Sequence, residues 1–257
     1  MDVVLLAGGL GTRLSEQTEV RPKPMVEIGG RPILWHIMKL YAQHDFKDFW
    51  IALGYKGSMI KQYFLNYYQL GGDLSIDLKD GNVEIARPQT EDWRVHLIDT
   101  GLHTNTGGRL EKLFDRMPGD TFMLTYGDGV ANVDLTALLD FHKNNDALVT
   151  LTAVRPTARF GSLDFDGDLI TRFSEKSQVR EGWINGGYMV MDRGVSEYFN
   201  GPDTNLEKGI LEKLAADGKL AVFKHDGFWQ CMDTQREVSL LNEMWLEGDP
   251  PWKVWHD

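Results

Sequence analysis

The sequence predicts an α/β protein built on a mixed, mostly parallel sheet. Short apolar runs typical of strands alternate with helix-like runs through most of the first 154 residues, which indicates βαβ units. A glycine-rich turn, AGGLG, directly follows the first apolar run. No linker rich in proline, glycine or serine interrupts the chain, so we expect one domain over residues 1–257.

The expected elements follow in order along the first half of the chain. The segment at 31–44 has apolar residues at 33, 34, 37, 38 and 41, which is helical spacing with Pro32 near its start. Strands are expected at 2–7, 48–54, 94–99, 121–128 and 147–154, with two short strands around Gly81 and Asn82. Further helices are expected at 57–68, after Gly107-Gly108, and at 135–145.

The second half of the chain is richer in strands. They are expected at 162–166, 169–175 and 186–192, and helices near 205–216 and 234–246 complete the chain. We therefore predict a β-rich extension added to the mixed sheet. The nucleotide-side region would be about 1–130, the extension about 131–235, and the C-terminal helix and tail 234–257.

Composition narrows the possible partners. The formal net charge is −11, which disfavours nucleic acid and anionic membranes. No apolar run approaches the 18 or so residues of a membrane span, and the N-terminus is a poor signal peptide. Cys231 is the single cysteine, which favours a reducing, cytoplasmic location. Residues 1–39 carry five basic and four acidic side chains, a local +1 that suits a small anionic ligand.

The glycine-rich turn predicts phosphate binding of an uncommon type. Gly9-x-Gly11-x-x reaches Leu14 rather than a third glycine, and no Gly-Lys-Ser/Thr follows, so neither the dinucleotide fingerprint nor the P-loop is matched. Gly8, Gly9 and Gly11 would let backbone N–H groups approach an anion, and Arg13 adds a permanent charge. A plain tight turn with a surface arginine is the alternative.

A lysine and two aspartates are further candidates. Lys23 lies between two prolines, which stiffen the chain, although a lone lysine is usually a solvated surface charge. Asp128 follows an apolar strand inside Gly-Asp-Gly, and Asp233 precedes a helix. Mg²⁺ takes one or two protein carboxylates beside phosphate oxygens, so this pair could hold it. The alternatives are a turn residue at 128 and a helix cap at 233.

Seven segments together resemble a known family. They are AGGLGTRL, PKPMVEIGGRPILWHIM, TGGRL, TYGDGV, FSEK, INGGYMV and FWQCMDT. This set resembles the sugar-1-phosphate nucleotidyltransferases over residues 2 to about 255, and TNTGGR with FWQCMDT resembles their cytidylyl branch. The resemblance implies a Rossmann-like, GT-A-like core and Mg²⁺-dependent transfer of CMP from CTP to α-D-glucose 1-phosphate. It also implies a role in deoxysugar and O-antigen lipopolysaccharide precursor synthesis, and a homo-oligomer, with a hexamer suspected.

The resemblance also implies roles for particular residues. Arg13, Lys23 and Asp128 would be catalytic, and Asp128 and Asp233 would bind Mg²⁺. The nucleotide would contact Leu6, Ala7, Gly8, Gly9, Leu10, Gly11, Thr12, Arg13, Lys23, Thr104, Arg109 and Asp128. The sugar phosphate would contact Glu175, Lys176, Asn185, Gly186 and, as a weaker candidate, Trp229.

Three other functions stay open. The same reaction could use UTP or dTTP, or another sugar 1-phosphate. A non-catalytic regulatory subunit that senses nucleotide sugars would be expected to lack one of Arg13, Lys23, Asp128 or Asp233, and all four are present. A GT-A glycosyltransferase usually carries a D-x-D metal motif, and Gly127-Asp128-Gly129 lacks its first aspartate.

Overall fold

The computed structural model describes residues 1–257 except 87–89, 157–161, 167–168, 175–181 and 257. The side chains of Arg13, Ser15 and Glu16, and those of the strands at 162–166 and 169–174, are also outside the description.

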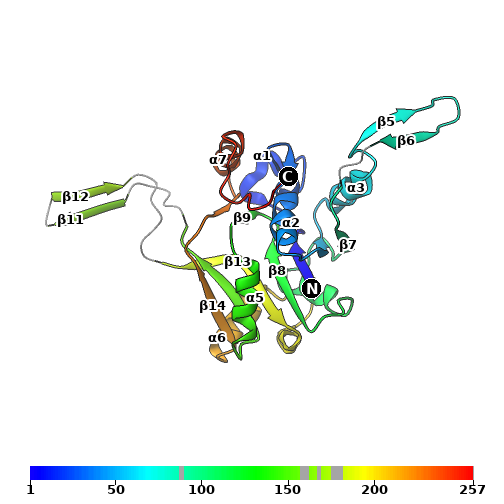
Figure 1. Ribbon diagram of the computed structural model, residues 1–257. Coiled ribbons are helices and arrows are strands. Elements are labelled where there is room, and N and C mark those ends of the chain that lie inside the picture. Colours follow the sequence, from blue (N-terminus) through cyan, green and yellow to red (C-terminus); the bar gives the residue numbers. More distant parts are fainter. Residues whose placement is uncertain (87–89, 157–161, 167–168, 175–181, 257) are drawn as a thin grey trace.

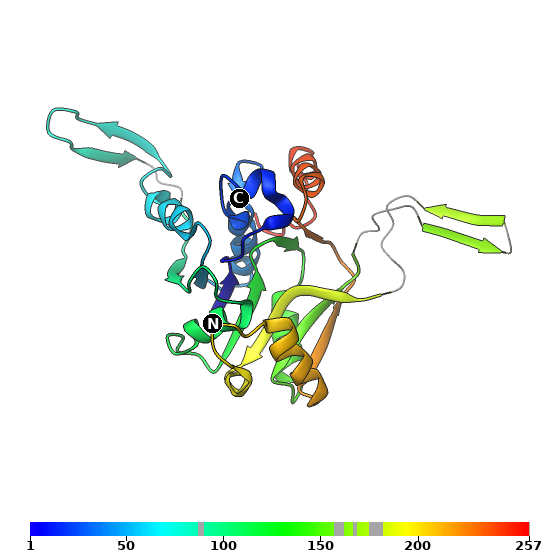
Figure 2. The ribbon, with the colours of Figure 1, turned by 180° about the vertical axis from the view of Figure 1, so that it is seen from behind.

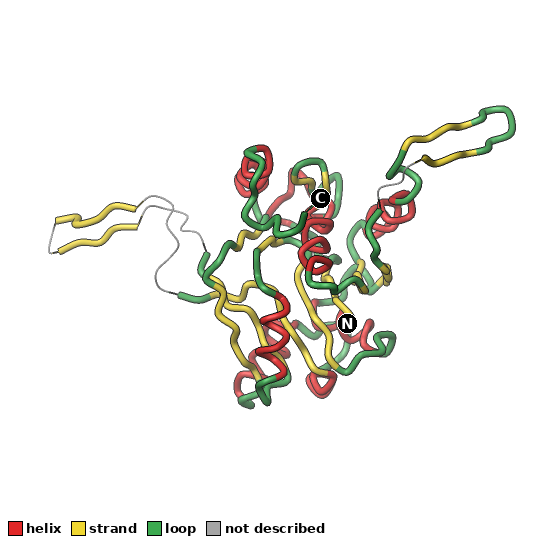
Figure 3. The backbone as a smooth tube through the Cα atoms, in the orientation of Figure 1, coloured by secondary structure: helices red, strands yellow, loops and turns green. Residues whose placement is uncertain are grey.

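A seven-stranded sheet forms the centre of the molecule (Figure 1, Figure 3). Its strands are β1 (Asp2–Leu6), β4 (Asp48–Leu53), β7 (Arg94–Asp99), β8 (Thr121–Tyr126), β10 (Val149–Val154), β13 (Ile184–Asp192) and β14 (Leu220–His225). They lie in the order β14-β10-β13-β8-β1-β4-β7. β13 runs antiparallel to both of its neighbours and the other adjacent pairs are parallel. The predicted mixed, mostly parallel sheet is therefore confirmed.

Helices cover both faces of this sheet. The α-helices are α1 (Ser15–Thr18), α2 (Ile33–Gln43), α3 (Gly57–Tyr67), α4 (Thr106–Phe114), α5 (Leu135–Lys143), α6 (Glu212–Ala216) and α7 (Gln235–Leu246). Shorter turns are the 3₁₀ segments η1 (Thr12–Leu14), η2 (Lys23–Met25) and η3 (Arg193–Tyr198), and the π-helical η4 (Leu206–Leu211). In Figure 1, α5 lies in front of the sheet. In Figure 2, which shows the opposite face, the orange segment η4–α6 lies in front.

The residues of β1 explain this two-sided arrangement. All five are buried, and successive side chains of a strand point to opposite faces. Val3 and Leu5 belong to the core beneath α2 and α5, whereas Val4 and Leu6 belong to the core beneath α4 and η4. β1 is thus buried on both faces. The glycine-rich segment follows its carboxyl end, and in such sheets ligands bind at the carboxyl ends of the strands.

Four two-stranded pairs lie outside the main sheet. They are β2 (Glu27–Ile28) with β3 (Arg31–Pro32), β5 (Asp73–Ile76) with β6 (Val83–Ala86), β9 (Gly129–Ala131) with β15 (Trp229–Cys231), and β11 (Ser162–Asp166) with β12 (Leu169–Ser174). The β5–β6 arm, residues 73–86, extends from the end of α3 away from the body (Figure 1, Figure 2).

The strand predicted at 186–192 is confirmed as part of β13, Ile184–Asp192, and it lies inside the main sheet rather than in an added extension. β14 was missed. The helix expected after Gly107-Gly108 begins at Thr106, with Asn105 as its N-cap, and so contains both glycines; η4 and its preceding loop pack against them. A Cβ at Gly108 would lie 2.4 Å from the carbonyl oxygen of Pro202. Among the described residues, no helix combines the length and apolar character that a membrane crossing requires.

A buried histidine makes stability depend on pH. His36 of α2 is fully buried, its Nε2 lies 2.9 Å from the carbonyl oxygen of Ile28, and Trp252 donates to its Nδ1 over 3.4 Å. Burial lowers the pKa of His36 to about 4. An unfolded histidine titrates near pH 6.5. Between pH 6.5 and 4, His36 is therefore protonated in the unfolded chain but stays neutral in the folded chain.

We therefore expect His36 to destabilise the fold progressively as the pH falls from about 6.5 to 4, by about 1.4 kcal/mol per pH unit. Above pH 6.5 this effect disappears. Urea unfolding at pH 7.0, 5.5 and 4.5 measures it, and His36→Gln should show a shallower loss of unfolding free energy with acid. Parallel pH profiles for the two proteins would contradict this assignment.

Candidate functional site

The glycine-rich segment forms a fixed loop at the carboxyl end of β1. The N–H of Ala7 donates to the carbonyl of Ala52 over 3.1 Å, and the N–H of Tyr55 donates to the carbonyl of Gly8 over 3.2 Å. Gly11 has φ of +66°, and a Cβ there would lie 2.7 Å from Cγ2 of Thr18. The loop is thus tied to the neighbouring strand β4 while its turn requires a glycine.

Arg109 of α4 supports this loop from beneath. Its side chain donates to the carbonyls of Leu53 (3.1 Å), Gly101 (2.8 Å), Leu102 (3.3 Å) and Gly8 (3.0 Å) and to Oγ1 of Thr100 (2.7 Å). The residue is only 4% exposed. Two glycines leave room for the guanidinium, since a Cβ at Gly8 or Gly54 would lie 2.2 or 2.5 Å from its Nη1. Arg109 therefore fastens three loops together at the end of the sheet.

A pocket of about 310 Å³ opens above the loop. It is lined by Leu6, Ala7, Gly8, Gly9, Gly11, Thr12, Lys23, Pro24, Thr104, Asn105, Thr106, Arg109, Tyr126, Gly127 and Asp128. Most residues predicted to contact a nucleotide thus surround one cavity. Of the rest, Leu10 is exposed and does not line it, while Arg13 lies in η1 with its side chain outside the description.

Sequence reasoning missed several residues that line this pocket. Asn105 caps α4, its side chain accepting from the N–H of Thr106. The hydroxyl of Tyr126 donates to Glu207 over 2.5 Å, and that of Thr106 donates to the same carboxylate over 3.1 Å. Glu207 therefore links two walls of the pocket from η4. The motif TNTGGR contained a signal for Asn105 and Thr106, but nothing local to Tyr126 indicated its partner.

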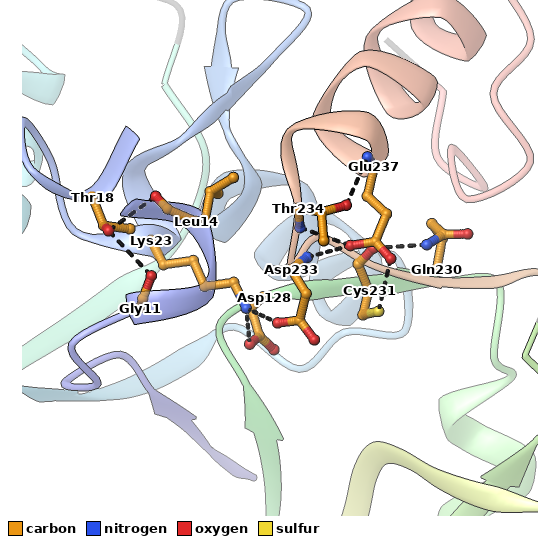
Figure 4. Close-up of polar contacts among 10 residues, drawn as sticks. All are labelled: Gly11, Leu14, Thr18, Lys23, Asp128, Gln230, Cys231, Asp233, Thr234 and Glu237. Carbon is orange, nitrogen blue, oxygen red and sulfur yellow. Dashed lines mark hydrogen bonds and ion pairs between the residues drawn. The ribbon is translucent and has the colours of Figure 1, made fainter. Parts of the chain in front are cut away.

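The two predicted metal aspartates converge on Lys23 (Figure 4). Nζ of Lys23 donates to Oδ2 of Asp128 over 2.7 Å and also to Oδ1 of Asp233. Burial alone would lower the pKa of Lys23, but the two carboxylates outweigh it and raise the pKa above its ordinary value. Lys23 is therefore a buried cation rather than the solvated surface charge of the alternative interpretation.

Glu237 holds Asp233 in place. Its carboxylate accepts from the backbone N–H of Asp233 (2.6 Å) and of Thr234 (2.8 Å), and Thr234 caps α7 in return. Asp233 thus immediately precedes the helix cap instead of being the cap itself. Next to them, burial, reinforced by Glu237, raises the pKa of the Cys231 thiol to about 12, so this thiol stays protonated at neutral pH.

The carboxylate pair suits a small divalent cation. Two carboxylates bind one ammonium, which leaves a formal net charge of −1, and Glu237 lies behind Asp233 on its backbone N–H. Within the described ranges no three His, Cys, Asp or Glu side chains form a metal-binding group. A cation held here would therefore keep ligands from water or from a bound phosphate, as Mg²⁺ prefers.

Three of the residues predicted to contact the sugar phosphate, Asn185, Gly186 and Trp229, lie on β13 and β15. Nε1 of Trp229 donates to the carbonyl of Gly186 over 2.7 Å, and β15 pairs Trp229 with Ala131 of β9, next to Gly129. The side chain of Asn185 accepts from the N–H of Gly187 over 2.9 Å. Trp229 and Gly186 are therefore brought together beside the acidic pair. Glu175 and Lys176 lie outside the described residues.

This arrangement is equipped for reactions at phosphate. A glycine loop supplies backbone N–H groups, a buried ammonium supplies positive charge, and two carboxylates can hold a metal. The described residues that line the pocket include no cysteine and no histidine. The groups that the site does bring together are suited to positioning phosphate and neutralising its charge.

Comparison with known proteins shows similarity to nucleotidyl transferases. The nucleotidyl transferase family model matches residues 2–244. The chain is 47% identical over 256 residues to glucose-1-phosphate cytidylyltransferase from Salmonella typhi, covering 99% of this chain and 100% of that protein. It is 42% identical, with the same coverage, to the probable glucose-1-phosphate cytidylyltransferase of Bacillus subtilis.

Solved structures share the fold. HddC from Yersinia pseudotuberculosis matches with a TM-score of 0.70 at 24% identity, over 95% of this chain and 99% of that one. A putative glucose-1-phosphate thymidylyltransferase from Bacillus anthracis matches with a TM-score of 0.66 at 19% identity, over 95% and 94% of the two chains. The predicted core fold is thereby confirmed.

Proposed function

The chain belongs to the nucleotidyl transferase family, and from that premise we propose that it converts CTP and α-D-glucose 1-phosphate into CDP-glucose and pyrophosphate. The observation that carries this proposal is the convergence of Lys23, Asp128 and Asp233 at the glycine-loop pocket. The full-length identity of 47% to a glucose-1-phosphate cytidylyltransferase supports this choice of substrates.

The reaction needs no covalent intermediate with the protein. A phosphate oxygen of glucose 1-phosphate attacks the α-phosphorus of CTP, a new P–O bond forms, and the bond to the bridging oxygen breaks as pyrophosphate leaves. The attacking phosphate is already ionised near neutral pH, so no general base is required. Lys23 would neutralise charge between the two reacting phosphates, and Arg13 would stabilise the departing pyrophosphate.

The remaining residues would bind the two substrates. The loop from Leu6 to Thr12 would hold the triphosphate, with Thr104 and Arg109 on the nucleotide side. The region at 1–130 would thus bind the nucleotide. The region at 131–235 would bind the sugar phosphate through Glu175, Lys176, Asn185, Gly186 and Trp229.

Mg²⁺ is the proposed cofactor, and the donor set fits it. Asp128 and Asp233 offer two hard oxygen ligands, and the two negative charges that they carry match a divalent cation. When bound, such a cation would make the α-phosphorus more electrophilic and offset phosphate charge. Glu237 would keep Asp233 directed toward it by holding the backbone.

The apolar surface of the β5–β6 arm supports a homo-oligomer. Leu74, Ile76, Leu78 and Val83 of the arm are exposed, and a two-stranded hairpin alone is marginally stable in water. A second copy of the chain would cover these side chains, and the resemblance suggests a hexamer. A cytoplasmic location and a role in deoxysugar and O-antigen precursor synthesis complete the proposal.

Charging the arm should therefore disrupt assembly. In the variant Ile76→Asp/Leu78→Asp, sedimentation velocity should detect a smaller species than the wild type, because buried carboxylates would be desolvated at the interface. Leu78 is 91% and Leu246 is 82% exposed, so Leu246→Asp, at the end of α7, is a matched control. An unchanged sedimentation coefficient for the arm variant would remove the arm from the interface.

Pyrophosphate release tests the reaction and its alternatives together. It would be measured with α-D-glucose 1-phosphate and Mg²⁺, comparing CTP, UTP, dTTP, ATP and GTP. The highest kcat/KM is expected with CTP. A preference for another triphosphate would overturn the base assignment. Absence of turnover with all five, and with other sugar 1-phosphates, would favour a regulatory subunit.

A further inference from the structure

The ammonium of Lys23 takes the position that a metal ion between the two aspartates would need. Nζ lies 2.7 Å from Oδ2 of Asp128 and also contacts Oδ1 of Asp233. The side chains of Lys23 and Asp233 are 10% and 12% exposed, and that of Asp128 is 35% exposed. Figure 4 shows Nζ bonded to both carboxylates, one from the strand end and one from the segment before α7.

A metal ion between the two aspartates would compete with the ammonium of Lys23 for this position. A magnesium ion binds carboxylate oxygens at about 2.1 Å, and at that distance from Oδ2 of Asp128 and Oδ1 of Asp233 its charge would repel the ammonium bonded to them. The like charges of Asp128 and Asp233 would also repel each other without a cation between them. Lysine provides a compact point charge with three donors, and here two carboxylates use it.

The side chain of Lys23 also has a second possible position, in the glycine-loop pocket. Its backbone is fixed, because the N–H of Met25 donates to Pro22 over 2.8 Å and that of Val26 donates to Lys23 over 3.1 Å. Its four-carbon stem, in contrast, can rotate. The residue lines the pocket with Gly11 and Thr12 of the glycine loop. Rotation of this stem away from the carboxylates would therefore turn the ammonium toward a phosphate bound in that pocket.

We propose that Lys23 is a built-in competitor of the metal: it neutralises Asp128 and Asp233 until a divalent cation displaces it, and the displacement delivers its ammonium to the phosphate pocket. This inference rests on the metal role proposed above for the two aspartates. It couples two events, since metal binding frees the lysine, and phosphate that attracts the lysine uncovers the metal ligands. Such coupling is reciprocal, so cation and nucleotide strengthen each other's binding.

Binding of Mn²⁺ alone, followed by electron paramagnetic resonance without nucleotide, tests the competition. Lys23→Met should bind Mn²⁺ at least about 10-fold more tightly than the wild type, because the competing charge is gone. Lys39→Met removes a lysine of α2 outside the pocket and should bind as the wild type does. Thermal unfolding should show Lys23→Met destabilised without Mn²⁺ and restored by it, more than the wild type.

A second measurement uses the unmodified protein and so does not depend on the folding of the variant. Acetylation of Lys23 by a small reagent, followed by mass spectrometry with Lys39 as the internal reference, should accelerate when Mg²⁺ is added. Equal Mn²⁺ affinities for wild type and Lys23→Met, with binding lost in Asp128→Asn, would overturn the competition alone. Binding that persists in both Asp128→Asn and Asp233→Asn would overturn the metal assignment and this inference with it.

Discussion

Asp128→Asn should lower kcat by about 10²–10³-fold, the cost of removing one electrostatic group from a site of this kind. The change keeps the shape of the side chain and an oxygen that can accept from Lys23, so the fold should persist. It removes the negative charge that the proposed metal site requires. KM for glucose 1-phosphate should change much less than kcat, because the interaction lost belongs to the transition state.

Steady-state kinetics with pyrophosphate detection measures this effect, and Asp233→Asn should behave similarly. Asp146→Asn is the matched control, because Asp146 is exposed on the loop between α5 and β10. Its kinetics should equal those of the wild type. A near-normal kcat for Asp128→Asn would show that this carboxylate is not a metal ligand, and the same holds independently for Asp233.

Arg109→Met should both destabilise the protein and impair nucleotide binding. The substitution removes the Arg109 donor from four carbonyls, of which Gly8 keeps the N–H of Tyr55 and Leu53 keeps Thr100. The carbonyls of Gly101 and Leu102 lose the donor described for them, each at a cost of about 1–3 kcal/mol. We expect a loss of about 3–5 kcal/mol, which lowers Tm by about 10 °C for a chain of this size. Because Gly8 belongs to the loop that Arg109 fastens, KM for CTP should rise as the loop loses its support.

Arg109→Lys separates two possible roles. Lysine keeps the charge but cannot reproduce the fork that reaches Gly8 and Leu53 together. We expect it to lower Tm nearly as much as methionine does, as measured by differential scanning calorimetry. An unchanged Tm in both variants, with KM for CTP raised, would instead assign Arg109 to direct contact with the nucleotide.

The sequence predicted the features that depend on local pattern. The apolar run and glycine turn at 2–11 indicated a strand and a phosphate-type loop, and β8 led directly to Asp128. Features that depend on pairing between distant segments were not visible. Asp233 lies far beyond Asp128 in the chain, and the pairing of β9 with β15, together with the N–H of Met232 on the carbonyl of Asp128 (2.8 Å), brings them together. No local pattern could show that meeting.

The features that the sequence missed have the same physical origin. The pattern at 186–192 predicts a strand but does not say which sheet the strand joins. Its place between β10 and β8 follows from long-range pairing. The contact of Arg109 with a nucleotide, which its motif suggested, stays a prediction, and what the sequence missed is its supporting role. Its hydrogen bonds to Leu53, Gly8 and the loop at 100–102 depend on three chain segments that sequence alone does not place.

The space that Gly8 and Gly54 leave for Arg109 has a practical consequence for enzyme engineering. A side chain at either position would displace the guanidinium from its hydrogen bonds, and at Gly54 a Cβ would also lie 2.6 Å from the carbonyl oxygen of Gly8, so variants at these codons are expected to lose stability. Thr104, Asn105 and Thr106 also border the pocket and lie outside that buried cluster. A screen for acceptance of a different base should place its diversity at these three positions and leave both glycines unchanged.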